Sequence, residues 1–412
     1  MKNICLVTNW YPTKENPYVG LFFKEQAFCV SEHYNFIVLH YKEYVKKKFW
    51  KKYIVKKINE EKNTVEYNLH IFIPIFVYFL DLFYDFKRKF LSRDTEDGVG
   101  KYISSTHIKY SYRILKQLFN KNFDFVIDVL YCVDGQSEAA IVNWISKIVG
   151  KPYIVGEHAP VPWPGRVIKD IDKHAFEQAD LFLAISVDKI RQLKVQNIKL
   201  PPIKYIGNLV DEEIFKINNK KKSDIKTFVI VASHSYYKNY DMFIAIMECL
   251  KEISEKQFKV LIVGYAADKG YAKNITEFEK KVSCSNFCDC MELIPEISHD
   301  KIVEIYNRAD AFVMTSIQEG QPVSAMEAAC CGLPIFATRC GGVEDYIDEK
   351  MGRIYSIVDA NGMALDLKKF LDEDLVFDSQ YIRNKVVSMF GKKAFINNFV
   401  IAFNEVIEDA DA

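Results

Sequence analysis

Two glutamates separated by seven residues, Glu319 and Glu327, stand in the segment of the sequence that is richest in chemical groups. The residues from Gly320 to Ser324 lie between them, and Pro322 is suited to the first turn of a helix. A helix that starts at the carboxyl end of a strand presents free N–H groups and the positive end of its dipole, which together bind phosphate. The segment therefore predicts a phosphate or diphosphate site with two carboxylates beside it.

The elements that must position these groups are predicted from short apolar runs. In the C-terminal half, β-branched-rich strands alternate with amphipathic helices, and Gly332 with Pro334 beyond it ends the last helix. The predicted strands are Phe228–Val231, Val260–Val263, Ala311–Met314 and Ile335–Ala337, and the predicted helices are Asp241–Ile253, Thr276–Val282, Asp300–Asn307 and Pro322–Cys331. This alternation predicts a doubly wound α/β domain with a parallel sheet.

The N-terminal half shows a similar alternation, with one long gap. The predicted elements are the strand Asn3–Thr8, a helix from Phe22 to Val30, the strands Phe36–Leu39 and Phe125–Ile127, the helix Ser137–Ile148, the strand Tyr153–Val155, the helix Asp170–Gln178 and the strand Leu181–Ile185. Residues 41–103 are assigned no helix or strand and are predicted to form an insertion or lid. The segment Pro201 to Asp211 is predicted to connect the two domains. A chain of 412 residues favours two domains, whose facing strand ends would bind ligands in a cleft.

Composition excludes several classes of function. Apolar residues make up 49% of the chain, which favours buried cores over disorder. Lys plus Arg and Asp plus Glu number 55 each, so nucleic acid is not expected as a partner. No G-x-G-x-x-G follows the first strand, which disfavours a dinucleotide oxidoreductase. The spacing of Cys284, Cys288 and Cys290 is not that of a zinc site, so no metal is expected.

Location is predicted from cysteines and from two unusual stretches. The scattered thiols and the short apolar run Ile4–Val7, too short for a signal-peptide core, predict a cytoplasmic protein. The apolar stretch Ile71–Phe83 is too short to span a bilayer. The lysine-rich run from Lys42 to Lys57 fits a solvated face and contact with anionic lipid headgroups equally well.

The string from Thr315 to Pro334 resembles the signature of the retaining glycosyltransferase family 4, which has the GT-B fold of two Rossmann-like doubly wound domains facing across a cleft. Three further segments extend the resemblance over nearly the whole chain: Asn9 to Gln26, Gly207 to Phe215, and Cys340 to Glu344. The first of them is similar to members that act in bacterial surface-polysaccharide pathways.

The resemblance assigns roles to residues of the C-terminal half. It implies that Glu319 holds the donor sugar as a catalytic residue, that Glu327 bonds the ribose hydroxyls, and that Lys238 lies on the diphosphate. The residues whose backbone N–H groups would bind the donor are Gly320, Gln321, Val323 and Ser324. Ser233 stands where the family has an arginine, and a hydroxyl offers neither charge nor a bidentate fork. His234 or another basic group is the expected substitute.

In the N-terminal half the resemblance implies that His158, after the strand Tyr153–Val155, lies close to the transferred sugar as a second catalytic residue. Gly20 would belong to an acceptor or phosphate loop. The implied domains are an acceptor-side domain over 1–208, a nucleotide-sugar domain over 209–385, and a C-terminal helix over 386–412 that packs back on the first domain.

The implied reaction moves a sugar, with retention, from a nucleotide-diphosphate sugar to a glycan or lipid-linked glycan acceptor in surface-polysaccharide biosynthesis. No cofactor or metal is expected, and the enzyme would be peripheral on the inner face of the cytoplasmic membrane. A nucleotide-sugar epimerase is the alternative within enzymes, since no pyridoxal lysine motif supports a phosphorylase. A non-catalytic sugar-nucleotide binder, favoured by Ser233, is the alternative outside enzymes.

Overall fold

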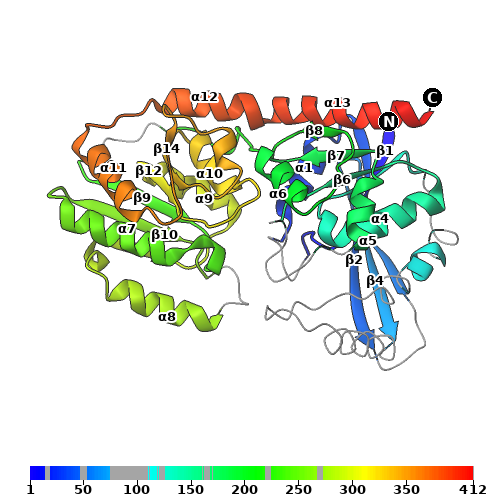
Figure 1. Ribbon diagram of the computed structural model, residues 1–412, viewed down its shortest axis with the longest axis horizontal. Helices are drawn as coiled ribbons and strands as arrows, with labels where there is room; N and C mark the ends of the chain where they lie inside the picture. Colours follow the sequence, from blue (N-terminus) through cyan, green and yellow to red (C-terminus); the bar gives the residue numbers. More distant parts are fainter. Residues whose placement is uncertain are drawn as a thin grey trace. The chain divides into compact units, whose positions relative to one another are not determined.

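The computed structural model describes residues 1–13, 19–46, 53–74, 110, 112–117, 119, 126–159, 161, 168, 170–218, 224–266 and 272–411. These residues form two compact units (Figure 1). The first unit consists of Met1–Ile185, Lys189–Ile206 and Ile396–Ala412, and the second of Ser186–Asp188 and Gly207–Phe395.

The first unit is built on an eight-stranded sheet in the order β3-β4-β2-β1-β5-β6-β7-β8. Its strands are β1 (Lys2–Thr8), β2 (Tyr34–Lys46), β3 (Tyr53–Glu61), β4 (Thr64–Pro74), β5 (Val129–Cys132), β6 (Tyr153–Gly156), β7 (Leu181–Ala184) and β8 (Ile203–Tyr205). Its helices are α1 (Leu21–Cys29), α4 (Gly135–Val149), α5 (Asp170–Glu177) and α6 (Val187–Val195). All strands run parallel except β3, which pairs antiparallel with β4. Chain order turns back at β1 and β5, so the loops after these strands meet at a topological switch point.

Two faces of this sheet are covered by different helices. Buried side chains of α4 and α5 pack against one face and form the main core of the unit. On the other face, Phe399 and Phe403 of the C-terminal helix α13 (Lys392–Asp411) stack on each other and meet Tyr34 and Tyr131. Tyr34 also donates its hydroxyl to Asn404 Oδ1 at 2.7 Å.

The second unit is built on a six-stranded, wholly parallel sheet in the order β11-β10-β9-β12-β13-β14. Its strands are β9 (Lys226–Val231), β10 (Phe258–Val263), β11 (Met291–Ile294), β12 (Ala311–Met314), β13 (Ile335–Thr338) and β14 (Gly352–Tyr355). Its helices are α7 (Tyr240–Ile253), α8 (Ala272–Ser283), α9 (Ile302–Arg308), α10 (Val323–Cys330), α11 (Ala360–Asp372) and α12 (Ser379–Phe390). Buried residues of α7, α8 and α11 pack on one face, while α9 and α10 lie on the other, where Tyr306 of α9 contacts Phe312 of β12. The two sheets with their helices are the Rossmann-like doubly wound domains that the sequence predicts.

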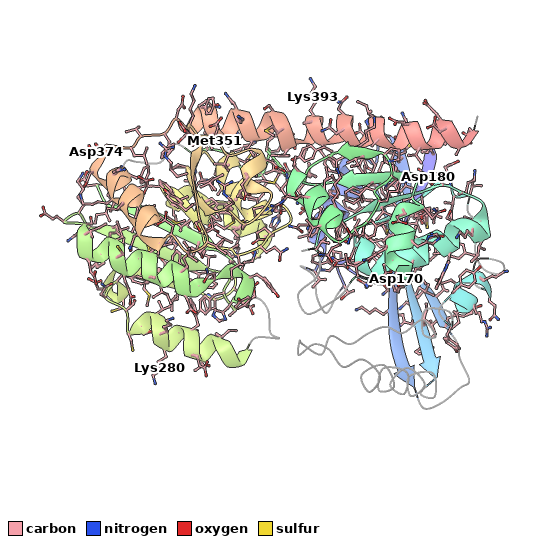
Figure 2. The ribbon with its side chains drawn as sticks, in the orientation of Figure 1. Asp170, Asp180, Lys280, Met351, Asp374 and Lys393 are labelled. Carbon is pink, nitrogen blue, oxygen red and sulfur yellow. The ribbon has the colours of Figure 1, made fainter. Side chains whose placement is uncertain are left out.

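An aspartate just before a strand fixes the register of the neighbouring strand in both units. The carboxylates of Asp128, Asp180 and Asp310 accept the backbone N–H groups of Asn3, Tyr153 and Thr227 at 2.7–2.8 Å, and their own N–H groups return a bond to the same residues. Asp180 is labelled in Figure 2. These reciprocal bonds satisfy backbone N–H and C=O groups at the amino end of each parallel sheet. That end is opposite the loops that carry the candidate site.

Several boundaries differ from the sequence predictions. Of the predicted strand Phe125–Ile127, Phe125 lies outside the described residues, and Val126 and Ile127 are not in a strand. The strand is β5, whose fully buried run starts at Val129. Part of the predicted connection at Pro201–Asp211 is instead β8, an edge strand whose partial burial hides its apolar pattern. The unassigned residues 41–103 contain the end of β2 and the strands β3 and β4 with the turn at residues 62 and 63 between them. Residues 47–52 and 75–103 lie outside the described residues.

The lysine run and the apolar stretch fall partly on described residues. Lys56 and Lys57 are exposed on β3, and Ile71 and Phe72 of β4 are buried in the sheet. Residues 47–52 and 75–83 lie outside the described residues. Among the residues that the structure describes, one helical stretch, Ser379–Asp411, is long and apolar enough to cross a membrane by length and composition alone. The buried aromatic rings of α13 fit a core helix equally well.

Candidate functional site

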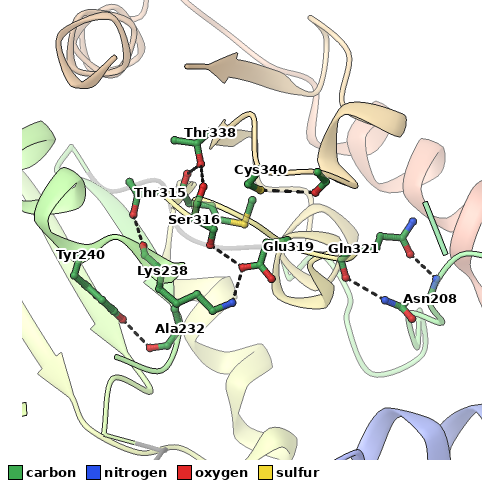
Figure 3. Close-up of polar contacts among 12 residues, drawn as sticks. Asn208, Ala232, Lys238, Tyr240, Thr315, Ser316, Glu319, Gln321, Thr338 and Cys340 are labelled. Carbon is green, nitrogen blue, oxygen red and sulfur yellow. Dashed lines mark hydrogen bonds and ion pairs between the residues drawn. The ribbon is translucent and has the colours of Figure 1, made fainter. Parts of the chain in front are cut away.

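Three loops converge at the carboxyl edge of the second sheet, following the neighbouring strands β9, β12 and β13. The loop after β12 is tied to the loop after β9 by the N–H of Ile317, which donates to Tyr237 O at 2.7 Å, and by Thr315 Oγ1, which donates to Lys238 O at 2.9 Å. The N–H of Glu319 donates to Cys340 O after β13 at 2.7 Å. The loops therefore form one hydrogen-bonded layer (Figure 3).

The glycine pair after β13 lets two of these loops touch. Gly342 has a φ of +76°, and a Cβ placed on it would lie 2.5 Å from the carbonyl oxygen of Gly320. A residue with a side chain would clash there and would also adopt an unfavourable backbone conformation. The similarity of this segment to a family glycine pair thus has a local physical reason.

Glu319 and Lys238 meet at the centre of the layer (Figure 3). Glu319 Oε1 accepts a hydrogen bond from Lys238 Nζ at 2.5 Å and from Ser316 Oγ at 2.7 Å. The two charged side chains are only 15% and 26% exposed, respectively. Sequence analysis assigns both residues to one donor site, and the structure brings them into direct contact as an ion pair.

The loop after β9 also carries Ser233 and His234. Ser233 is partly buried, two residues beyond the end of β9. The ring of His234 stacks on Tyr240 with centroids 5.4 Å apart and meets Phe278 at 4.8 Å. Burial lowers the pKa of His234, which favours a neutral ring.

Helix α10 begins directly beyond Glu319. Pro322 is its N-cap, and the first intrahelical donor is Met326, whose N–H bonds to Pro322 O at 3.3 Å. The N–H groups of Val323 and Ser324 precede that bond, as is usual for a first helical turn. Gln321, by contrast, is buried, and its side-chain and backbone oxygens accept from the backbone and amide nitrogens of Asn208 at 2.5 and 3.0 Å.

Glu327 is buried in the middle of α10 rather than exposed on it. Its Oε1 lies 2.9 Å from Nε2 of His299, and its Oε2 accepts the hydroxyl of Tyr306 at 2.9 Å. His299 lies in the 3-10 turn His299–Lys301 that precedes α9, and Tyr306 lies within α9. Sequence analysis missed both partners, because nothing in the spacing of α9 and α10 indicates which of their polar residues meet.

Comparison with known proteins finds a family match in this part of the chain. Residues 210–386 match the family model described as Glycosyl transferases group 1. The matched segment is similar to group 1 glycosyltransferases. It contains Ser233, Lys238, Glu319 and Glu327.

Individual relatives are distant. The chain is 28% identical over 180 residues to a component of the phosphatidylinositol N-acetylglucosaminyltransferase of Arabidopsis thaliana, and the match covers 43% of this chain and 39% of that protein. The chain spans less than two thirds of the length of every curated relative that it matches.

Solved structures resemble the whole chain. Sucrose-phosphate synthase from Thermosynechococcus elongatus has a TM-score of 0.70 at 15% identity and covers 99% of this chain and 100% of its own. HepE of Anabaena in complex with UDP and glucose has a TM-score of 0.65 at 12% identity, with 98% and 100% covered. Identities this low show the fold alone: the chain has the GT-B fold.

The first unit contains His158 and Gly20, both outside the residues that the family model matches. His158 follows β6 and is buried, with its ring 4.7 Å from that of Phe23 and 5.6 Å from that of Phe22. Gly20 has a φ of +66° at the N-cap of α1, and a Cβ there would lie 2.3 Å from Trp10 O. The backbone of Gly20 thus packs against the backbone of Trp10, where a side chain would clash.

Sequence analysis also missed a buried carboxylate at the switch point of the first unit. Glu138 accepts four hydrogen bonds, from Thr8 Oγ1 at 2.8 Å and from the N–H groups of Asn9, Val133 and Asp134 at 2.7–3.2 Å. Burial, and then the nearby Asp134, raises the pKa of Glu138 to about 8. The glutamate joins the loops after β1 and β5, and its place in the first turn of α4, directly before the apolar run from Ala139 to Val142, was the available signal.

Two further buried side chains, Glu157 and Lys189, bond to the loop that contains His158. Glu157 accepts the N–H groups of Ala159 at 2.9 Å and Gln136 at 3.2 Å, and burial raises its pKa well above the usual range. Lys189, fully buried, donates to the carbonyl oxygen of Ala159 and opposes this rise in the pKa of Glu157. These charges position backbone rather than face a ligand.

No group of three or more His, Cys, Asp or Glu side chains that could hold a metal ion occurs among the residues that the structure describes. Of the three clustered cysteines, Cys284 and Cys288 are exposed, and Cys290 donates its thiol to Phe287 O at 3.1 Å.

Proposed function

We propose that the protein is a retaining glycosyltransferase that moves a sugar from a nucleotide-diphosphate sugar to a hydroxyl of a glycan or lipid-linked glycan. The observation that carries the proposal is the contact between Lys238 and Glu319 beside the first turn of α10. One cation, one carboxylate and a helix N-terminus together suit a ligand that joins a diphosphate to a sugar.

In the proposed complex, the diphosphate lies against Lys238 and the N–H groups of Val323 and Ser324. The bond between the anomeric carbon and the phosphate oxygen breaks, and the acceptor hydroxyl oxygen takes its place on the same face of the sugar. The proton of that hydroxyl passes to an oxygen of the leaving diphosphate. Negative charge grows on the leaving diphosphate, which Lys238 and the helix N-terminus stabilise without a metal ion. Glu319 holds the sugar hydroxyls rather than attacking the anomeric carbon, and the role of His158 stays a prediction from the resemblance.

The Lys238–Glu319 ion pair has a consequence for this scheme. Lys238 must exchange a carboxylate oxygen for a phosphate oxygen when the donor binds, which frees Glu319 to accept sugar hydroxyls. The pair thus keeps both side chains ordered, and compensates the charge of each, before the donor arrives.

The acceptor and the location are proposed from one relative and from the exposed residues of β3. The Arabidopsis relative is named for phosphatidylinositol, which supports a lipid-linked acceptor. Lys56 and Lys57 are exposed on the edge strand β3 together with Ile54 and Ile58, a combination suited to an anionic lipid surface. We propose a cytoplasmic enzyme that is peripheral at the inner membrane and acts in surface-polysaccharide biosynthesis.

A thermal-shift screen with UDP, GDP, ADP and their common sugar conjugates tests donor binding. A ligand at a hundredfold excess over its dissociation constant stabilises the folded state by about 2.7 kcal/mol. Lys238→Ala should reduce the shift, whereas Lys251→Ala, which removes an exposed lysine paired with Asp289 in the same unit, should not. If no nucleotide shifts the wild-type protein, the proposed function is wrong.

A non-catalytic sugar-nucleotide binder is the second candidate, because Ser233 provides no charge for the leaving group. The two candidates differ in turnover: an enzyme releases nucleoside diphosphate when acceptor is added, and a binder does not.

A further inference from the structure

Glu327 is held by two donors although it is almost fully buried. Its side chain is 6% exposed, and each of its oxygens meets a different partner at 2.9 Å, Oε1 the ring of His299 and Oε2 the hydroxyl of Tyr306. A carboxylate oxygen only accepts, so Nε2 of His299 must carry a proton and donate it. The two bonds together fix the plane of the carboxylate.

The two donors are in turn fixed by a shared aromatic neighbour. The ring of Phe215, which is buried, lies 5.7 Å from the ring of His299 and 6.0 Å from that of Tyr306, both edge to face. The backbone oxygen of Phe215 accepts the thiol of Cys330 in α10 at 3.2 Å and the guanidinium of Arg383. The segment that enters the second unit is therefore built into the support of Glu327.

The held carboxylate retains capacity for a ligand. A carboxylate has about four acceptor positions, and the hydrogen bonds to His299 and Tyr306 use one on each oxygen. One position on each oxygen is left for two neighbouring hydroxyls, which is the arrangement of donors on the vicinal diol of ribose. A lone donor would not need both oxygens to be oriented.

We infer that His299 and Tyr306 are positioning residues that orient the two oxygens of Glu327 toward the ribose diol of the donor. The inference rests on the proposed function, because it takes a nucleotide as the ligand. When either donor is lost, the carboxylate turns and the diol is recognised less well. Contacts of the diphosphate with Lys238 do not depend on this orientation.

The test compares ribonucleotides with their deoxy forms. Binding of UDP, GDP and ADP, and of their 2′-deoxy and 3′-deoxy counterparts, is measured by calorimetry for the wild type, His299→Phe and Tyr306→Phe. Tyr381→Phe is the matched control, since it removes a tyrosine hydroxyl that donates to Asp348 Oδ2 at 2.8 Å in the same unit. Circular dichroism and melting temperature establish that each variant is folded.

The wild type should bind its ribonucleotide about tenfold more tightly than at least one deoxy form, the loss expected for one hydrogen bond to a charged group. In His299→Phe and Tyr306→Phe this ratio should fall to about threefold or less, while in Tyr381→Phe it should stay unchanged. Rescue of the ratio by His299→Gln, whose amide can donate, would support orientation by hydrogen bonding.

The contradicting outcomes are distinct from failure of the proposed function. If no ribonucleoside diphosphate binds the wild type, the proposed function fails and this inference with it. If ribonucleotides bind but the wild type does not discriminate against either deoxy form, or if both variants weaken all ligands by the same factor, the inference is overturned and the proposed function stands.

Discussion

Because Glu319 pairs with Lys238, replacing Glu319 by glutamine should affect binding of the diphosphate and transfer of the sugar in different ways. The carboxylate accepts from Lys238 Nζ at 2.5 Å, so a bare nucleoside diphosphate must compete with it for the lysine. In Glu319→Gln the lysine no longer faces a negative charge. Bare nucleoside diphosphate should then bind as tightly as before or more tightly, although turnover should fall at least tenfold because the sugar loses its acceptor.

The magnitude follows from the exposure of the pair. Partly exposed ion pairs contribute up to about 1 kcal/mol, and exposures of 15% and 26% place this one toward that limit. Release of the lysine should therefore tighten diphosphate binding by up to about fivefold. Lys238→Met loses a charge-assisted hydrogen bond of about 1.5–3 kcal/mol. In this variant the diphosphate does not have to break the ion pair with Glu319, which offsets up to about 1 kcal/mol of the loss. The net weakening of diphosphate binding is therefore about 2- to 30-fold.

Calorimetry with UDP, GDP and ADP, together with initial rates on the matching nucleotide sugar, measures both quantities. Lys251→Met and Asp289→Asn form the control, because they break an exposed pair with an Nζ–Oδ1 distance of 3.0 Å in the same unit. These control variants should change neither affinity nor rate. The reasoning is refuted if Glu319→Gln weakens bare diphosphate binding as much as Lys238→Met does.

Three further outcomes are expected. Burial lowers the pKa of His234, so its contribution to folding stability is complete above pH about 6.5 and is lost as the pH falls through the lower folded pKa. In melting temperatures taken from pH 8 to 5, His234→Phe should therefore show a smaller drop on the acid side than the wild type. An equal drop in both proteins would exclude His234 as its cause. In urea unfolding, Gly342→Ala should lower the free energy of unfolding by about 2 kcal/mol more than Gly150→Ala does. Both glycines have a positive φ, but only at Gly342 would a Cβ lie 2.5 Å from a backbone oxygen. Equal losses of stability would mean that the loops can separate. Co-sedimentation with anionic vesicles at low salt should be lost at high salt if the run from Lys42 to Lys57 binds headgroups, and absence of pelleting at low salt would leave those lysines as a hydrated surface.

The C-terminal sheet was the most predictable part of the fold. Strands such as Val260–Val263 and Ala311–Met314 are buried on both faces, so their apolar runs are unbroken, and the structure confirms them within two residues. The strands β3 and β8 were not predicted from the sequence, because each is an edge strand with alternating or partial burial. An exposed edge leaves little hydrophobic pattern in the sequence.

The residues of the candidate site were predictable as types and positions, but their partners were not. Glu319 and Lys238 follow neighbouring strands, which is enough to expect proximity. Burial of Glu327 against His299 and Tyr306 depends on how α9 and α10 pack on the sheet, and the packing of two helices on one face is not encoded in local spacing. The same holds for Glu138, whose four donors come from two loops far apart in the chain.

The central claim, that the protein transfers a sugar from a nucleotide donor, is tested most directly by product analysis. Purified protein is incubated with the nucleotide sugar that binds best and with a lipid-linked glycan extract, and nucleoside diphosphate release, acceptor mass and anomeric configuration are measured together. The account predicts release that depends on acceptor, one added sugar with the configuration of the donor, and a rate at least tenfold lower in Glu319→Gln. Tight binding of the donor without acceptor-dependent release, equal in wild type and Glu319→Gln, would contradict it.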